Sequence, residues 1–335
     1  MEMKKHEINV AVVGVGSMGK NHARVYSEIA NLIAVADINE KQGKEVAERL
    51  GVMWYKDYHD LLNMNIDAVS IAVPTKYHYT VAKDFIDHGK HVLVEKPLCL
   101  DMEEAENLVS LAKSAGIVLA VGFIERHNPV VRFVKEGLRN KKLGKIISAS
   151  SRRVSSFPSR IRDVGVILDL AVHDIDIMRY LVGSDVVSVY TVGGRNGESA
   201  YETHASITLK FRNGVVGYVE ANWLTPMKVR KLWLTCTQNY VEIDYIKQSV
   251  RVSEARVMEH DSMDLFRVPF EYNIREFSLK KEEPLKNELH DFLGAIEEKR
   301  RPLVSGEDAV KTMAVAFSAI ESLNTGEVVE IDSRT

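Results

Sequence analysis

Cysteine is scarce in this sequence, which limits the chemistry expected of it. The only cysteines are Cys99 and Cys236, and they lie far apart in the chain. That spacing indicates neither a disulfide framework nor a cysteine metal site. We therefore expect two reduced thiols, as in a protein of a reducing compartment.

A surplus of positive charge is also lacking. The 335 residues carry 44 Lys and Arg against 47 Asp and Glu, a formal net charge of −3. General nucleic-acid binders need an excess of basic side chains facing the phosphates. The sequence predicts no nucleic-acid partner, although a local basic patch is allowed.

Long apolar runs are missing as well. Residues 1–7 are polar and lack the apolar centre of a signal peptide. No uninterrupted apolar run approaches the ~18 residues that span a bilayer. We expect no membrane partner and a cytoplasmic location.

The first third of the chain alternates short apolar runs with helical stretches, which is typical of a doubly wound parallel sheet in an α/β fold. The expected strands are 8–13, 32–36, 68–73, 91–94 and 117–121, and the expected helices are 20–30, 40–50, 78–88 and 102–115. We expect an N-terminal Rossmann domain over residues 1–123.

From residue 124 the strands alternate polar and apolar residues, which predicts an α+β domain with a largely antiparallel open sheet over 124–335. The expected strands are 146–154, 186–192, a hairpin within 205–223 that turns at Asn213-Gly214, and 231–245; the expected helices are 164–182, 284–300 and 306–325. An open sheet needs cover on one face. This domain is therefore predicted to bind substrate and to form a homo-oligomer, a dimer or tetramer, through its sheet.

A glycine-rich turn follows the first strand. Gly14-Val15-Gly16-Ser17-Met18-Gly19 fits G-x-G-x-x-G, opens a helix, and is followed by Asp37 at the end of the next strand. The N–H groups of such a turn and the helix dipole face a pyrophosphate. The Asp37 carboxylate can accept hydrogen bonds from ribose hydroxyls and would repel the 2′-phosphate of NADP. The predicted cofactor is NAD, bound at Gly14, Gly16, Ser17, Met18, Gly19 and Asp37.

Four further segments resemble the glucose–fructose oxidoreductase, inositol dehydrogenase and MocA (Gfo/Idh/MocA) family of dehydrogenases. They are 71–78 (A-x-P-x-x-x-H), 94–98 (E-K-P), 163–174 (G-x-x-x-D-x-x-x-H) and 302–309. The resemblance implies cofactor contacts at Val73, Pro74, Thr75, His78, Glu95 and Lys96. Lys76-Tyr77 departs from the usual Asn or Asp of the family, which would change local cofactor contacts.

The candidate catalytic residues are Lys96, His173 and Asp169. Lys96 follows a strand at its carboxyl end, where ligands bind in such sheets, and an ammonium can stabilise a developing alkoxide. Asp169 and His173 are four residues apart on one helix and so share a face, which suits an imidazole base oriented by a carboxylate. A surface lysine, a core histidine, or a metal site that includes Asp176 are the alternatives; no metal is expected, because hydride chemistry does not require one.

Within the family, 122–129 and 157–162 resemble the branch that oxidises nucleotide-linked N-acetylhexosamines at C3. Arginines are dense here and nearby, at Arg126, Arg152, Arg153, Arg160 and Arg162, and guanidinium groups suit a diphosphate, although solvated surface arginines are an equal alternative. The expected substrate contacts are Arg126, His127, Asn128, Arg160 and Arg162. The resemblance implies an NAD-dependent dehydrogenase of UDP-N-acetylglucosamine. The alternatives are an inositol or other free-polyol dehydrogenase and a non-catalytic NAD-binding regulator.

Overall fold

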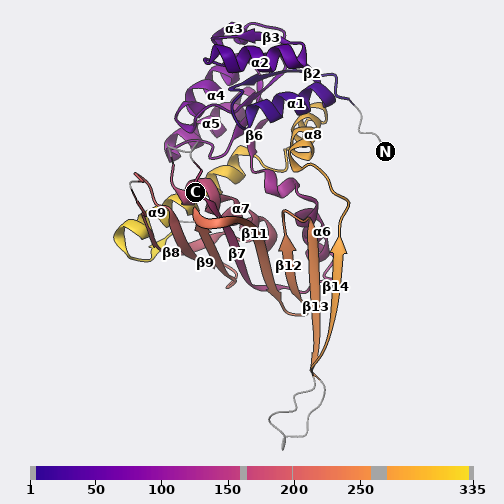
Figure 1. The fold of residues 1–335 in the computed structure, drawn as a ribbon, viewed down its shortest axis with the longest axis vertical. Coiled ribbons are helices and arrows are strands. Elements are labelled where there is room, and N and C mark those ends of the chain that lie inside the picture. The colour runs from indigo at the N-terminus through magenta and orange to yellow at the C-terminus, as the bar shows by residue number, and fades with distance from the viewer. Residues whose placement is uncertain (1–4, 159–163, 198, 258–269, 332–335) are drawn as a thin grey trace, which may run out of the picture. The chain divides into compact units, whose positions relative to one another are not determined.

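The computed structural model describes residues 5–158, 164–197, 199–257 and 270–331. The chain forms two compact units, each of which contains one sheet (Figure 1). Unit 1 comprises Met1–His127 and Glu283–Ala314, and unit 2 comprises Asn128–Glu282 and Val315–Arg334.

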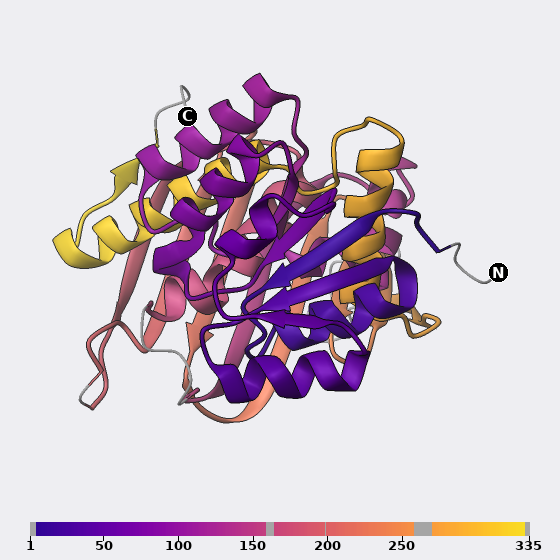
Figure 2. The ribbon, with the colours of Figure 1, turned by 90° about the horizontal axis from the view of Figure 1, so that it is seen from above.

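This division differs from the contiguous domains expected from the sequence, because a C-terminal segment belongs to unit 1. Helix α8 (Pro284–Glu297) buries Leu289 and Phe292 in the same apolar core as Val25 of α1 (Gly19–Ile29). The two helices lie side by side in both ribbon views (Figure 1 and Figure 2). An apolar helix face is stabilised by whichever surface covers it, and here that surface is made by the first helix of the chain.

The sheet of unit 1 has six parallel strands in the order β3-β2-β1-β4-β5-β6. Their bounds are β1 Asn9–Val13, β2 Asn31–Ala36, β3 Met53–Tyr55, β4 Ala68–Ile71, β5 His91–Glu95 and β6 Leu119–Gly122. The order reverses between β1 and β4, and ligands bind outside the carboxyl ends of strands at such a switch point. The predicted Rossmann fold is confirmed; β3 was not predicted.

The helices of unit 1 include those expected from the sequence and the short α3, which was not expected. They are α1, α2 Glu40–Leu50, α3 His59–Leu62, α4 His78–Asp87, α5 Met102–Ala115 and α8, with short 3₁₀ turns at Thr75–Tyr77 and Ile124–His127. The Asp101 side chain accepts a hydrogen bond from Glu104 N and caps the start of α5. Gly116 ends that helix with a φ of 68°, a conformation that costs glycine little.

The sheet of unit 2 has nine strands in the order β14-β13-β12-β11-β7-β10-β9-β8-β15. Their bounds are β7 Ile146–Ser156, β8 Val186–Gly194, β9 His204–Phe211, β10 Val216–Asn222, β11 Leu224–Cys236, β12 Tyr240–Asp244, β13 Ser249–Val257, β14 Phe270–Ser278 and β15 Val329–Glu330. Within it β7 and β10 pair parallel, and the other pairs are antiparallel. The predicted hairpin turns at Gly214, whose φ is 87°.

One face of this sheet is covered by helices. Helix α6 (Pro129–Arg139), the π-helix Ile167–Ala171 and α7 (Val172–Val182) contact it, while α9 (Gly306–Thr325) spans the division between the units. Across the described ranges, we find no helix with both the length and the apolar character needed to cross a membrane.

Candidate active site

The glycine-rich turn is shaped so that side chains would not fit at two of its positions. Gly14 has a φ of 81°, and a Cβ there would lie 2.8 Å from the backbone of Ala72. A Cβ on Gly19 would lie 1.7 Å from the carbonyl oxygen of Gly14. At Gly16 the nearest neighbour of a Cβ would be Gln42 Nε2 at 3.9 Å, which leaves open space above the turn. This turn fits the close approach of a pyrophosphate.

Asp37 lies at the carboxyl end of β2 beside this turn. Its carboxylate accepts hydrogen bonds from Val15 N at 2.8 Å, Asn39 N at 2.8 Å and Gln42 Nε2 at 3.1 Å. All three partners are neutral N–H groups, so these contacts leave the negative charge in place. A partly exposed carboxylate held in this way suits ribose hydroxyls and disfavours a 2′-phosphate. The residues present therefore fit NAD.

The loop after β4 was also expected to contact the cofactor. Val73 and Pro74 are at least partly exposed there, whereas Thr75 is buried. His78 is only 1% exposed, with Nδ1 2.9 Å from the Pro97 carbonyl oxygen and Nε2 2.9 Å from the Val73 carbonyl oxygen. These contacts make His78 a bridge between two loops, whereas the sequence had predicted a cofactor contact.

Lys96 follows β5 directly. It is partly exposed, while Glu95 before it and Pro97 after it are buried. The Lys96–Pro97 peptide is cis. The lysine side chain therefore starts from a buried backbone at the edge of the sheet where ligands bind.

Asp169 and His173 share one helical region of unit 2. Asp169 lies in the π-helix and His173 in the first turn of α7. From Val164 to Met178, all described, these two are the partly exposed residues and the others are buried. A π-turn inserted in an α-helix is frequent at functional sites. Glu202 supports the start of this region, where its carbonyl and carboxylate oxygens accept the N–H groups of Val166 and Ile167.

The alternative of a metal site with Asp176 gains no support from the geometry. Asp176 is 1% exposed. Among the residues that the structure describes, no cluster of three or more His, Cys, Asp or Glu side chains is arranged to hold a metal ion.

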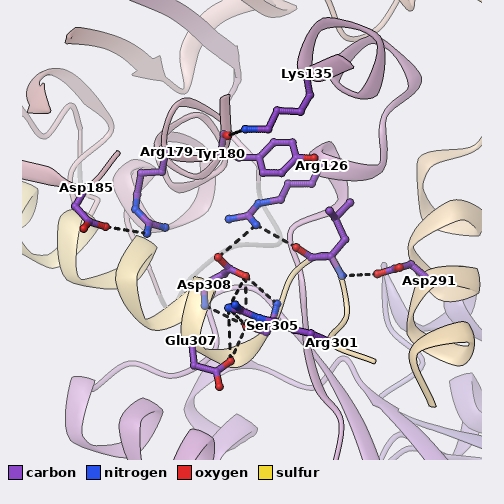
Figure 3. Close-up of polar contacts among 11 residues, drawn as sticks. Arg126, Lys135, Arg179, Tyr180, Asp185, Asp291, Arg301, Ser305, Glu307 and Asp308 are labelled. Carbon is purple, nitrogen blue, oxygen red and sulfur yellow. Dashed lines mark hydrogen bonds and ion pairs between the residues drawn. The ribbon is translucent and has the colours of Figure 1, made fainter. Parts of the chain in front are cut away.

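Arg126 was expected to hold substrate phosphate, but it contacts Leu303 and Asp308 of unit 1. It is 3% exposed; Nη1 donates to the Leu303 carbonyl at 3.1 Å and lies 3.6 Å from Asp308 Oδ1 (Figure 3). Asp308 in turn accepts hydrogen bonds from Arg301 and Ser305. These contacts give Arg126 a structural role in anchoring the segment before α9.

The other expected substrate residues divide into buried and undescribed ones. His127 is 4% exposed, and its carbonyl accepts Asn287 Nδ2 at 3.2 Å. Asn128 is 2% exposed and caps α6, with Oδ1 accepting Val130 N at 3.3 Å. Arg160 and Arg162 lie outside the described residues.

Of the remaining arginines, Arg153 forms a buried ion pair with Asp174, the neighbour of His173, with Nε 2.7 Å from Oδ2. Arg152 points to the other face of β7, where it is about half exposed and pairs with Glu220 at 3.0 Å. The dense arginines of the sequence therefore do not form one phosphate site among the described residues.

His22 was not among the residues expected at the site, yet its Nε2 lies 3.0 Å from Glu95 Oε1. His22 is 0% exposed and stands four residues before the buried Tyr26 on the inner face of α1. A polar residue on an apolar helix stripe was the available signal. Glu288 gave the same signal on α8, between Leu285 and Leu289, and it is 3% exposed.

Both parts of the chain match models of known protein families. Residues 8–123 match the oxidoreductase family with an NAD-binding Rossmann fold, and residues 131–242 match the GFO/IDH/MocA C-terminal domain. The chain is 31% identical over 313 residues to the UDP-N-acetylglucosamine 3-dehydrogenase of Acidithiobacillus ferrooxidans, covering 92% of this chain and 95% of that protein. A solved structure of that enzyme superposes with a TM-score of 0.85 at 28% identity, covering 95% of this chain and 98% of the other.

A second relative acts on a different kind of substrate. The chain is 27% identical over 344 residues to the scyllo-inositol 2-dehydrogenase (NAD(+)) of Bacillus subtilis, covering 98% of this chain and 97% of that protein. Both relatives are named as dehydrogenases, one of a nucleotide sugar and one of a free polyol.

Proposed function

The chain belongs to the Gfo/Idh/MocA family of oxidoreductases, and from that premise we propose that it oxidises the C3 hydroxyl of UDP-N-acetylglucosamine to a ketone. It is an NAD-dependent dehydrogenase of sugar or polyol hydroxyls, as the sequence motifs predicted. The observation that supports this substrate assignment is the 31% identity to the UDP-N-acetylglucosamine 3-dehydrogenase, which extends over 92% of the chain.

The proposed chemistry removes a hydride from the carbinol carbon and a proton from its oxygen. NAD⁺, when bound, supplies the acceptor for the hydride. The imidazole of His173 takes the hydroxyl proton, a task suited to a histidine near neutral pH. Lys96 Nζ donates a hydrogen bond to the same oxygen and stabilises its developing negative charge. Asp169 orients the imidazole or holds a neighbouring sugar hydroxyl.

The exposure of these side chains supports their assignment. Lys96 and His173 are partly exposed residues set among buried neighbours, which suits side chains that have to meet a substrate. A thiol nucleophile is not part of the proposal, because burial raises the pKa of Cys99 to about 12 and that of Cys236 to about 11. Since Lys96 and His173 are both present, no observation favours the non-catalytic regulator.

Phosphate recognition in this proposal is assigned to Arg160 and Arg162 by resemblance, since Arg126 contacts Leu303 and Asp308. Diphosphate binding away from the reacting carbon would help to hold the C3 hydroxyl in place. Free N-acetylglucosamine should then be a poor substrate in kcat as well as in affinity.

A substrate panel tests the proposal. Purified protein is incubated with NAD⁺ and UDP-N-acetylglucosamine, other UDP-hexoses, free N-acetylglucosamine or inositols. NADH absorbance is followed and the product is identified by mass and NMR. We expect UDP-N-acetylglucosamine to give the highest kcat/KM and a 3-keto product. Efficient turnover of an inositol with UDP-N-acetylglucosamine inert would assign the enzyme to the free-polyol class instead.

We also propose that the enzyme is cytoplasmic and forms homo-oligomers through the open face of the unit 2 sheet. Tyr190 and Tyr218 lie on that face, and each pairs with Thr208 on the strand between them. Tyr190 is 40% exposed and Tyr218 is 49% exposed. Light scattering coupled to size exclusion should give a mass of two or four chains. Replacing Tyr218 by Glu should lower that mass, and a monomeric wild type would contradict the oligomer.

A further inference from the structure

A buried chain of hydrogen bonds in unit 1 ends at the residue before Lys96. Glu95 Oε1 lies 3.0 Å from His22 Nε2, and His22 Nδ1 lies 3.2 Å from Ser70 Oγ. Ser70 Oγ lies 2.9 Å from the hydroxyl of Tyr26. The chain thus connects three elements, α1, β4 and β5. The second carboxylate oxygen of Glu95, Oε2, accepts a hydrogen bond from the backbone N–H of Lys96 at 3.2 Å.

These side chains have little freedom to move. His22, Ser70 and Tyr26 are each 0% exposed, and Glu95 is 9% exposed. Gly122 of β6 faces the carboxylate so closely that a Cβ there would lie 3.0 Å from Glu95 Oε2. Packing and hydrogen bonds together therefore determine the direction of the Glu95 carboxylate.

The loop that contains Lys96 is also held at Pro97. His78 Nδ1 lies 2.9 Å from the carbonyl oxygen of Pro97, the residue after Lys96. Lys96 is partly exposed, but the residues on both sides of it are buried and bound to the interior by histidines. The arrangement fixes the backbone from which the lysine side chain extends.

We propose that Glu95 is a positioning residue for Lys96, and that His22 acts by holding the Glu95 carboxylate toward the Lys96 backbone. This inference rests on the proposed function, in which Lys96 contacts the substrate oxygen. Neither Glu95 nor His22 needs to touch substrate. A misplacement of about 1 Å in a catalytic group can cost on the order of 10²-fold in rate, which is the scale of effect expected.

The charges around Glu95 agree with this role. Burial raises the pKa of Glu95, but the hydrogen bond from His22 and the charges of His22, Lys96 and His78 lower it, and the net pKa is below its ordinary value. The remaining facing group is Glu288 of α8. Burial raises the pKa of Glu288 well above its ordinary value, and the charge of Glu95 adds to this. These shifts favour the charged form of Glu95 and the neutral form of Glu288.

Two histidine variants separate positioning from mere packing. In His22→Gln the side-chain amide retains a donor near the Nε2 position, whereas in His22→Asn the side chain is too short to reach Glu95. We expect His22→Asn to lower kcat about 10–100-fold and His22→Gln to recover most of that loss. Both variants should still bind NADH, as measured by fluorescence, because the glycine-rich turn is untouched. Thermal unfolding reports whether both variants fold.

The pH profile gives a second readout. Without the His22 donor, the pKa of Glu95 rises, so His22→Asn should lose kcat at acid pH more steeply than the limb set by His173, whereas His22→Gln should keep the wild-type limb. Glu95→Gln should have a low kcat at every pH and keep only the acid limb set by His173. A folded His22→Asn enzyme with wild-type kcat and acid limb would overturn the inference.

A double-mutant cycle distinguishes failure of this inference from failure of the proposed function. It uses the best substrate of the panel and compares Lys96→Ala, Glu95→Gln and the double variant. We expect Glu95→Gln to add little in the Lys96→Ala background, because Glu95 acts through Lys96. Additive losses would overturn the positioning role. Wild-type turnover in Lys96→Ala would instead overturn the proposed role of Lys96, and the inference with it.

Discussion

Asp174, the residue after His173, receives two hydrogen bonds from the guanidinium of Arg153. Nε lies 2.7 Å from Oδ2 and Nη2 lies 3.2 Å from Oδ1, and both side chains are 1% exposed. Arg153 also lies over the ring of Tyr245, 5.3 Å from its centroid. This pair fixes α7 to β7 inside unit 2, one residue from the proposed base.

Breaking this pair should be costly. Arg153→Met leaves the Asp174 carboxylate buried without this counter-charge, which typically costs about 3–5 kcal/mol in the free energy of unfolding. The matched control is Arg152→Met on the same strand, which removes a half-exposed pair worth about 0–1 kcal/mol. Urea unfolding followed by circular dichroism measures both, and equal losses would show that the buried pair contributes no special stability.

Glu288 should make stability depend on pH. Its pKa in the folded protein is well above the ordinary 4.5, because burial disfavours the charged carboxylate. The folded state therefore keeps a proton that the unfolded chain releases, so the contribution of Glu288 is complete below pH 4.5 and is lost as pH rises.

Glu288→Gln stays neutral at every pH. Its Tm should exceed that of the wild type by a widening margin, reaching a few degrees, between about pH 5 and pH 8. Glu45→Gln, on the exposed face of α2, is the control and should give a constant difference. A constant difference for Glu288→Gln too would mean that Glu288 is charged in the folded protein.

Asp37 should determine the preference for NAD. In Asp37→Ser the acceptor for the ribose hydroxyls is lost and the repulsion of a 2′-phosphate is removed. The Kd for NADH should rise about tenfold, the equivalent of one charged hydrogen bond of about 1.4 kcal/mol, while NADPH binding should improve. Isothermal titration measures both, with Glu40→Gln as the neighbouring control. Tighter NADPH binding by the wild type would contradict this role.

Turnover should depend on His173 and Lys96. His173→Asn should lower kcat by about 10²–10⁴-fold, the range for a lost general base. NADH binding should barely change, because the glycine-rich turn and Asp37 are unaffected. His204→Asn serves as the control on the unit 2 sheet. Lys96→Ala should also lose turnover while it retains cofactor. Near wild-type kcat in His173→Asn would remove His173 from the mechanism.

Much of unit 1 could be predicted because its signals are local. The turn at Gly14 needs a positive φ, the Asp101 cap lies three residues from its N–H donor, and apolar runs alternate with helices. The hairpin at Asn213-Gly214 and both C-terminal helices were predicted for the same reason. Steric limits on φ and hydrogen bonds over three or four residues are properties of the sequence itself.

Local signals did not predict the π-helix that carries Asp169, or helix α6, or the membership of α8 in unit 1. A π-turn has no simple residue pattern, and an amphipathic helix specifies that its face will be covered without specifying by what. The apolar residues of α8 required a partner surface that lies more than 200 residues earlier in the chain.

The sequence by itself determined the family and the cofactor, and it predicts Lys96 and His173 as catalytic residues, because each of these rests on a short motif with a fixed local geometry. Only the tertiary structure decided what surrounds them. His22 meets Glu95 across 73 residues, Arg153 meets Asp174 across 21, and Arg126 meets Leu303 across 177. Such pairs form because a buried polar group must find a partner in the folded interior, and which partner it finds depends on how distant segments pack.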